Sequence, residues 1–284
     1  MEHPETRVAI AYDFDGTLAP GNMQEHSFIP ALGLDKNEFW AEANTLAREN
    51  DADQILTYMQ LMLRKAEQKR IAITRSALEE HGRKIRFFNG VETYFDRMDH
   101  FAKEYNTCID HYVISSGVRE IIQGTSIAKY FRYIFASGFI FNAEQVAEWP
   151  ALAINYTNKT QYLFRINKGI MNSYDNSEIN KFIPYDERPL PFNRMIYVGD
   201  GETDVPAMKM IKYQGGKAIA VYDPDKQGSP DNPSGREICE QLILDDRADY
   251  IAPADYSENS PLDKIIKSLI QIMSHEDHLI QLGR

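Results

Sequence analysis

The sequence predicts an α/β fold in which a parallel sheet is flanked by helices, with a block of helices inserted after the first strand. Short apolar runs of strand length alternate with amphipathic helical patterns along most of the chain. Several of these runs end in glycine next to carboxylate or hydroxyl residues. Alternation of strands with helices is typical of sheets whose strands run parallel, and ligands bind at the carboxyl ends of such strands.

Composition places the chain among globular proteins that act on small molecules. It has 284 residues, 43% of them hydrophobic, and a net charge of −11 at pH 7. This acidic balance argues against binding to nucleic acid or to an anionic membrane, since both require clustered cations. No stretch resembles a signal peptide or a membrane span, and Cys108 and Cys239 match no metal or redox spacing. We therefore expect a cytoplasmic protein.

The first strand, Val8 to Tyr12, ends in Asp13-Phe-Asp-Gly-Thr. Five uncharged residues in a row are typical of a strand that is buried on both faces. Asp13 and Asp15 are two residues apart, so their side chains leave the same face of the last pleat. Two carboxylates held close repel unless a cation lies between them or one takes a proton. Alternatively, they belong to an ordinary polar turn.

A helical block follows from about residue 24 to residue 86. Asn37, Asp53 and either Thr74 or Ser76 can cap its helices, and apolar residues recur at helical spacing after each cap. We interpret these stripes as core. A further helix opened by Asn89-Gly90 leads to the second strand.

The second strand, His111 to Ile114, ends in Ser115-Ser116-Gly117 before a helix over 118–123. Hydroxyls and backbone amides at a helix N-terminus can hold an anionic oxygen. The competing interpretation is that the serine is an ordinary helix cap.

The stretch from Tyr130 to Tyr156 predicts a small hairpin at the sheet edge, from short β-like segments at 133–136, 139–141 and 151–156. Lys159 then opens a helix, an unusual place for a cation because the helix dipole disfavours it. Lys168, on the same helix, fits a solvated face.

The last strand that ends in acids is Met195 to Val198, followed by Gly199-Asp200 and then Asp204. The remaining elements carry no evident chemistry: a surface excursion over 173–193, helices over 205–211, 237–242 and 262–273, strands over 217–222 and 248–252, a loop over 223–235, and a fraying tail from residue 274.

A parallel sheet brings these strand ends together at one edge, where they form a phosphate and magnesium site. Carboxylate oxygens suit Mg²⁺ shared with a substrate phosphate, and a lysine with a hydroxyl can bind phosphoryl oxygens. A carboxylate can then attack phosphorus to form an aspartyl-phosphate.

In order, these four segments resemble the signature motifs of the haloacid dehalogenase superfamily, beginning with Asp-x-Asp-x-Thr at Asp13. The resemblance covers nearly the whole chain and implies a Rossmann-like parallel sheet flanked by helices. The resemblance implies that Asp13 is the nucleophile and Asp15 the general acid/base. It implies that the phosphate ligands are Ser115, Ser116, Gly117 and Lys159, of which Lys159 is also catalytic. It further implies that Asp13, Asp15 and Asp200 bind the metal, and that Thr17 and Asp204 are supporting residues. Lys168 is the lesser candidate for the third motif, which is defined by position only.

The same resemblance implies two domains: a core of residues 1–20 and 87–284, and a small helical cap of residues 21–86. Such a cap is similar to that of the phosphoserine phosphatase-like branch. Asn22 or Met23 stands where that enzyme is expected to carry a glutamate for the substrate amine, with Gln24 and Glu25 just beyond. Phosphoserine is therefore a doubtful substrate.

The expected function is that of a Mg²⁺-dependent phosphatase acting on a small phosphorylated metabolite, as a monomer or homodimer. Asp15 favours phosphoryl transfer, because the dehalogenase branch lacks an acid there. A phosphomutase would use the same residues, and a non-catalytic metabolite-binding module is the remaining alternative.

Overall fold

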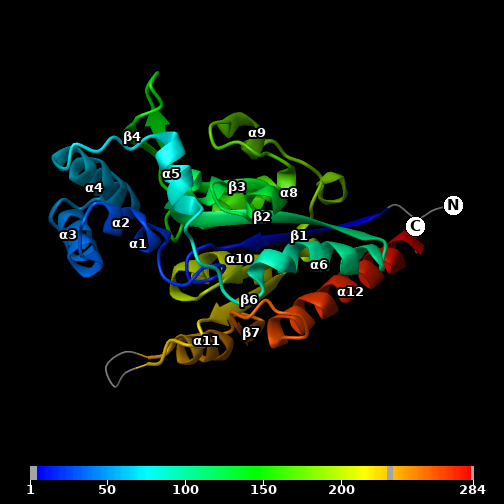
Figure 1. Ribbon diagram of the computed structural model, residues 1–284. Helices are drawn as coiled ribbons and strands as arrows, with labels where there is room; N and C mark the ends of the chain where they lie inside the picture. Colours follow the sequence, from blue (N-terminus) through cyan, green and yellow to red (C-terminus); the bar gives the residue numbers. More distant parts are fainter. Residues whose placement is uncertain (1–4, 229–232, 283–284) are drawn as a thin grey trace.

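One seven-stranded sheet forms the centre of the computed structural model, which describes residues 5–228 and 233–282. Neighbouring strands are parallel, except that β4 runs antiparallel to β3. The predicted parallel α/β fold is thereby confirmed (Figure 1). The strand order is β4-β3-β2-β1-β5-β6-β7, with bounds β1 Thr6–Tyr12, β2 Thr107–Val118, β3 Phe131–Phe141, β4 Ala147–Leu152, β5 Met195–Gly199, β6 Lys217–Tyr222 and β7 Tyr250–Pro253.

Helices connect the strands and cover both faces of the sheet. The α-helices are α1 Met23–His26, α2 Phe28–Ala31, α3 Lys36–Glu49, α4 Gln54–Gln68, α5 Arg75–Gly82, α6 Val91–Lys103, α7 Arg119–Gln123, α8 Lys159–Lys168, α9 Asn176–Asn180, α10 Val205–Tyr213, α11 Gly235–Leu244 and α12 Pro261–Leu282. Short 3-10 turns are η1 Ala128–Tyr130, η2 Tyr185–Glu187, η3 Phe192–Arg194 and η4 Glu202–Asp204. Among the described residues, no helix is both long and apolar enough to cross a membrane.

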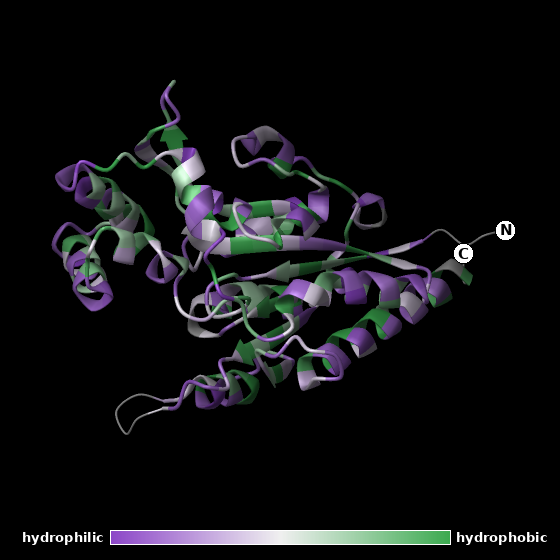
Figure 2. Cartoon of the chain, in the orientation of Figure 1, coloured by the Kyte–Doolittle hydropathy of each residue, from purple (hydrophilic) through white to green (hydrophobic). Residues whose placement is uncertain are grey.

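Strand β1 divides the core into two apolar clusters, because its successive side chains point to opposite faces. Val8, Ile10 and Tyr12 belong to the cluster that contains the buried residues of α6 and α12. Ala9 and Ala11 belong to the cluster that contains those of α8, α10 and α11. All five are at most 2% exposed, as expected for a strand covered on both sides. In Figure 2 the strands carry mostly hydrophobic residues, while α6 and α12 are striped with polar ones.

The order of the strands places a crevice at the carboxyl end of β1. From β1 the chain continues to β2 and β3 on one side of it, and later to β5, β6 and β7 on the other. The chain therefore builds the sheet outward from one side of β1 as far as β4, and then crosses back to pair β5 with the other side of β1. In open α/β sheets, ligands bind at such a switch point.

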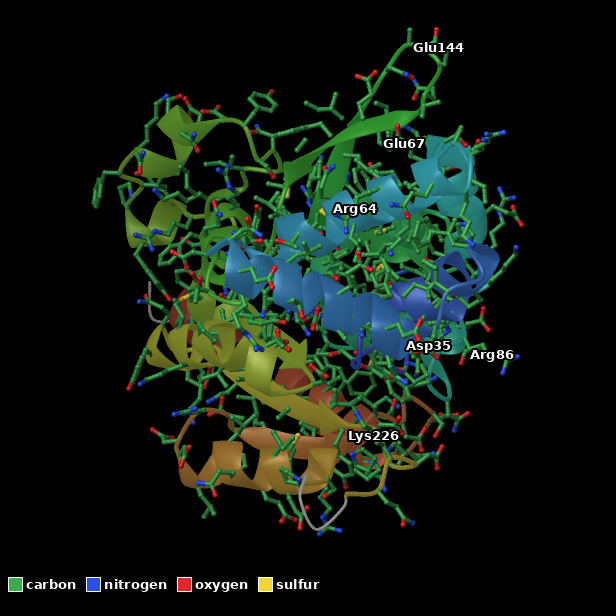
Figure 3. All side chains as sticks on the ribbon, turned by 90° about the vertical axis from the view of Figure 1, so that its left-hand side faces the viewer. Asp35, Arg64, Glu67, Arg86, Glu144 and Lys226 are labelled. Carbon is green, nitrogen blue, oxygen red and sulfur yellow. The ribbon has the colours of Figure 1, made fainter. Side chains whose placement is uncertain are left out.

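Helices α1 to α5 lie at the end of the molecule opposite the two chain termini (Figure 1). In Figure 3, which faces this end, α3 and α4 cross in front of the sheet, with Lys226 below them. Phe39 and Met59 of these helices belong to the same apolar cluster as Val8 of β1, so packing is continuous between the block and the sheet. The division into a core and a cap domain stays a prediction.

Two helix ends, the start of α3 and the end of α12, depart most clearly from the sequence-based expectation. Helix α3 is capped by Asp35, whose side chain accepts from the backbone N–H groups of Asn37 and Glu38. The predicted cap, Asn37, lies inside the helix, because an aspartate two residues earlier already satisfies these amides. Asp53 and Thr74 cap α4 and α5 as predicted. Residues 274–282, which the sequence predicts as a fraying tail, continue α12 to Leu282, and Asp277 accepts hydrogen bonds from Thr6 and Arg194.

The edge hairpin has one strand fewer than expected. The two segments predicted at 133–136 and 139–141 form the single strand β3. Ser137 holds the strand through the apparent turn, because its hydroxyl donates to the Ser116 carbonyl and accepts from the Ile154 amide. The third segment is β4, which lies at Ala147–Leu152 and not at 151–156.

A buried carboxylate, Asp263, fixes α12 against α6. It accepts from Arg97 at 3.0 Å and from Lys267 at 3.0 Å, and its side chain is fully buried. Burial raises the pKa of Asp263, but the hydrogen bonds from Lys267, the Asn259 amide and Arg97 outweigh burial and lower it below the ordinary value. The carboxylate is therefore a stabilising charge at neutral pH.

We expect Asp263→Asn to lower the free energy of unfolding by about 2 kcal/mol, because it leaves two cations without their shared carboxylate. Urea unfolding monitored by circular dichroism measures this change. Because the folded pKa is lowered, the contribution is complete above the unfolded value, about 3.9, and is lost as the pH falls through the folded pKa. Glu240→Gln, which breaks the exposed pair with Arg236, should have a far smaller effect. Equal losses for the two variants would contradict this account of α12.

Candidate active site

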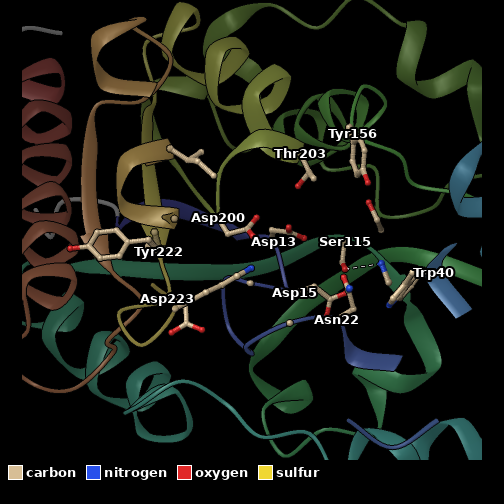
Figure 4. A pocket seen from close by; sticks show the side chains of 18 of the residues that line it. Asp13, Asp15, Asn22, Trp40, Ser115, Tyr156, Asp200, Thr203, Tyr222 and Asp223 are labelled. Carbon is tan, nitrogen blue, oxygen red and sulfur yellow. Dashed lines mark hydrogen bonds between the residues drawn. The ribbon is translucent and has the colours of Figure 1, made fainter. Parts of the chain in front are cut away.

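The carboxyl ends of β1, β2 and β5 line one pocket of about 510 Å³. Asp13 and Asp15 follow β1, Ser115 to Gly117 form the end of β2, and Asp200 follows β5. In Figure 4 the side chains of Asp13, Asp15, Ser115 and Asp200 gather around a common space. The structure thus brings together the strand ends that the sequence singles out.

A glycine turn allows β1 and β5 to present their acids side by side. Gly16 has a φ of +74°, a conformation that L side chains rarely adopt. A Cβ at this position would lie 2.1 Å from Oδ2 of Asp200. The turn after Asp15 therefore packs directly against the Asp200 carboxylate.

Lys159 forms an ion pair with the first acid of the motif. Its Nζ lies 3.0 Å from Oδ2 of Asp13, while Oδ1 of Asp13 accepts from the Phe14 amide at 2.7 Å. The lysine is 1% exposed and stands at the first position of α8. Lys168, at the other end of that helix, donates to the carbonyls of Ile179 and Lys181 instead. Of the two lysines, the structure brings Lys159 to Asp13.

Asp204 holds this lysine from the other side. Its Oδ1 accepts from Lys159 Nζ at 2.7 Å and from the Tyr197 hydroxyl at 2.6 Å, and its Oδ2 accepts from the Asp200 amide at 3.2 Å. Through these three hydrogen bonds, the Asp204 carboxylate positions the Lys159 ammonium and the backbone of Asp200. The supporting role that the resemblance implies for Asp204 stays a prediction.

The pKa values of the buried carboxyl groups are raised, which indicates an excess of negative charge at the site. Burial and the nearby Asp204 raise the pKa of Asp13 to about 7, although Lys159 acts in the opposite direction. Burial, Asp204 and Asp13 likewise raise the pKa of Asp200 well above its ordinary value. Burial alone would lower the pKa of Lys159, but Asp13 and Asp204 raise it on balance, so the lysine is charged. One ammonium does not balance these carboxylates.

The donor set fits a divalent cation. Asp13, Asp200 and Asp204 each offer one oxygen within 4.8 Å of the others. Hard carboxylate oxygens are the ligands that Mg²⁺ prefers, and a cation there would relieve the repulsion that raises the carboxyl pKa values. Asp13 and Asp200 are the members with lone pairs to spare, since Asp204 is occupied by protein donors.

Asp15 lies outside this group of three acids. Its Oδ1 accepts from the Met23 amide at 2.9 Å, and a Cβ on Gly117 would lie 3.2 Å from its Oδ2. Burial and the Asp13 charge raise the pKa of Asp15 well above its ordinary value, which favours the protonated acid. Its predicted place among the metal ligands stays a prediction.

The end of β2 carries hydroxyl and amide groups at an irregularity in the pairing of the strand. The pairing of β2 with β3 shifts between Ser115 and Val118, and Ser115 Oγ accepts from the Gly117 amide at 3.0 Å. Ser116 Oγ is buried without a hydrogen-bond partner and lines the pocket. Thr17, in the turn after Asp15, is fully buried and its Oγ1 also has no partner; it is not among the residues that line the pocket.

A hydrogen bond joins the helical block to the loop before Lys159. Asp53 uses Oδ1 to cap α4 and accepts from Asn155 Nδ2 on Oδ2 at 2.8 Å. The Asn155 carbonyl accepts in turn from the Lys159 backbone amide at 3.3 Å. Asn155 is therefore hydrogen-bonded both to the capping residue of α4 and to the backbone of Lys159.

Sequence reasoning missed the outer wall of the pocket. Trp40, Tyr58 and Tyr156 line it, as does Tyr222 after β6. From sequence alone, the helical stripe that contains Trp40 indicates core packing. A tryptophan and a tyrosine within largely aliphatic stripes were the available signal, since both combine an apolar ring with a polar group.

The chain is similar to known proteins in sequence and in fold. The sequence model of the family described as haloacid dehalogenase-like hydrolase matches residues 10–209. An uncharacterized protein of Borreliella burgdorferi is 28% identical over 289 residues, covering 92% of this chain and 96% of that protein.

Solved structures show a similar fold. A HAD family hydrolase from Salmonella enterica serovar Typhi has a TM-score of 0.58 at 16% identity, covering 94% of this chain and 72% of that one. A phospho-aspartyl intermediate analogue of phosphoserine phosphatase has a TM-score of 0.53 at 15% identity, covering 93% and 99%. A probable phosphoserine phosphatase from Vibrio cholerae has a TM-score of 0.58 at 11% identity, covering 96% and 68%.

The family match spans the three strand ends that line the pocket and also Lys159, from the end of β1 to the start of α10. The chain therefore belongs to the haloacid dehalogenase-like hydrolase family.

Proposed function

We propose that this hydrolase is a phosphatase that cleaves a small phosphomonoester through an aspartyl-phosphate on Asp13. The observation that carries the proposal is the pairing of Asp13 with a buried, charged lysine at the switch point of the sheet. An oxygen of Asp13 lies at the pocket beside that ammonium, which attracts a phosphate dianion and stabilises charge on its oxygens.

In the first step, an oxygen of Asp13 attacks phosphorus and the bond from phosphorus to the ester oxygen breaks. Asp15, whose raised pKa favours the protonated acid, gives its proton to the departing oxygen, which leaves as an alcohol. In the second step, Asp15 takes a proton from water as that water attacks the aspartyl-phosphate. Inorganic phosphate leaves, and both carboxyl groups return to their starting states.

Other groups of the chain position the phosphate. Ser115, Ser116 and Gly117 can donate hydrogen bonds to its oxygens from the end of β2. Asp13 and Asp200 would hold Mg²⁺, which when bound neutralises charge on the phosphate. Helices α1 to α4 would exclude bulk water during the first step.

We expect Asp13→Asn to abolish turnover while the fold survives, because the change keeps the volume and removes only the nucleophilic oxygen. Phosphate release from p-nitrophenyl phosphate measures turnover, and circular dichroism checks the fold. A folded variant with the parent's rate would refute the mechanism. Equal amounts of phosphate and alcohol from the parent enzyme distinguish hydrolysis from transfer to a second substrate.

Removal of divalent cations with EDTA should silence the enzyme. Mg²⁺ should restore phosphate release and Ca²⁺ should not, because Ca²⁺ takes more ligands at longer distances and misplaces the nucleophile. Full activity with Ca²⁺, or activity that persists in EDTA, would contradict a role for Mg²⁺ in the reaction.

Lys159→Met should reduce kcat by about 10²-fold or more, as expected for the loss of one preorganised donor. Lys168→Met is the matched change at the far end of α8. It should leave kcat near the parent value, because the hydrogen bonds of the Lys168 ammonium go to the backbone carbonyls of Ile179 and Lys181, in the segment after α8. Both are measured on folded protein at saturating Mg²⁺. The reverse ranking would assign the phosphate-binding role to Lys168.

A further inference from the structure

The turn that leads into α8 is fixed by two asparagines, Asn155 and Asn158. The Asn155 side-chain oxygen accepts from the Asn158 amide at 3.0 Å, and the Asn158 side-chain oxygen accepts from the Asn155 amide at 2.9 Å. This reciprocal arrangement is that of a capping box, in which two side chains satisfy backbone amides at the start of a helix. The Asn155 carbonyl also accepts from the Lys159 amide at 3.3 Å. The box therefore supports the residue that carries the ammonium.

One hydrogen bond joins this box to the cap of α4. Asp53 accepts from the first amides of α4 with Oδ1, and its Oδ2 accepts from Asn155 Nδ2 at 2.8 Å. The start of α4 and the turn before α8 therefore meet at one carboxylate, whose negative charge is favourable at the positive end of a helix dipole. Gln54 and Tyr156, which follow the two partners in the chain, both line the pocket. The bond thus connects two walls of the pocket.

Helix α4 is also bonded to the end of β2. The Tyr58 hydroxyl, in the second turn of α4, donates to the Ser116 carbonyl at 2.7 Å. Ser116 and Lys159 belong to the two segments that are proposed to bind the phosphate group. Both segments are therefore hydrogen-bonded to the same helix and its cap. The position of α4 and the arrangement of the phosphate-binding groups are consequently not independent.

We propose that Asp53 and Asn155 are positioning residues, and that the hydrogen bond between them raises the affinity of the site for a phosphate group by holding the Lys159 turn against α4. The inference rests on the phosphatase function proposed above, because it concerns the same phosphate site. Neither residue lines the pocket, so neither touches the reacting atoms. By linkage, a phosphate bound at Lys159 stabilises the docked position of α4 by as much as docking improves phosphate binding.

Asp53→Asn separates the effect of the hydrogen bond from the effect of the charge. An amide has one oxygen, which can cap α4 or accept from Asn155 but not both, so one of the two links is lost. The variant also removes a negative charge near an anion site, which by itself would tighten phosphate binding. We expect the affinity for inorganic phosphate, measured by calorimetry at saturating Mg²⁺, to fall by about 5-fold or more. The value of kcat/KM for p-nitrophenyl phosphate should fall in parallel.

The double variant Asp53→Asn/Asn155→Asp should return the phosphate affinity to within about 2-fold of the parent's. It exchanges donor and acceptor, so that an amide at position 53 donates to a carboxylate at position 155, while each position keeps an oxygen for its own helix cap. Relative to Asp53→Asn, the second substitution adds a negative charge, which electrostatics alone would predict to weaken phosphate binding further. Recovery of the affinity therefore reports the hydrogen bond.

Asp35→Asn is the matched control. Asp35 is exposed and caps α3 in the way that Asp53 caps α4, but the hydrogen bonds described for its side chain stay within α3. This variant loses the same charge and should keep the parent's phosphate affinity. Hydrogen exchange without ligand gives a second measurement. Asp53→Asn should speed exchange of the amides at 156–159, about 100 positions away in the chain, whereas Asp35→Asn should not.

The possible outcomes separate this inference from the proposed reaction. A parent protein that binds phosphate but releases none from any ester would overturn only the proposed function. Unchanged or tighter phosphate binding by Asp53→Asn, a double variant no better than the single one, or an equal loss of affinity in Asp35→Asn would overturn only the inference. A parent that binds no phosphate would overturn both.

Discussion

The burial of one ammonium between two carboxylates is the constraint on which this site depends. Lys159 is almost fully removed from water and is stabilised there by Asp13 and Asp204. A buried charge of this kind persists only when its partners are held in place. The first residue of α8, the end of β1 and the turn before α10 must therefore meet at one point, which the parallel order of β1 and β5 provides.

Much of the fold could be predicted because its signals are local. Uncharged runs and helical stripes identify the strands and helices, and each of the main strand ends is marked by a glycine beside polar residues. The misplaced elements depend on distant contacts instead. Ser137 joins two apparent strands by bonding to Ser116 and Ile154, and Asp277 holds the polar end of α12 through Thr6 and Arg194. Sequence alone does not contain such contacts.

The residues of the site also divide into those that the sequence could locate and those that it could not. Asp13, Ser115, Lys159 and Asp200 could be located because each stands at the end or beginning of an element, and the sheet determines where those ends lie. The wall opposite them could not, since Trp40 and Tyr58 follow the same helical spacing as core residues.

The two carboxylate oxygens of Asp53 link helix α4 to the segment that leads to Lys159. One carboxylate oxygen begins α4, and the other holds Asn155, whose carbonyl supports the first turn of α8. Moving α4 away from the sheet breaks the bond to Asn155 and withdraws support from the segment that leads to the ammonium. In the proposed phosphatase, the position of α4 and the position of the ammonium that would bind the phosphate are therefore coupled through Asn155.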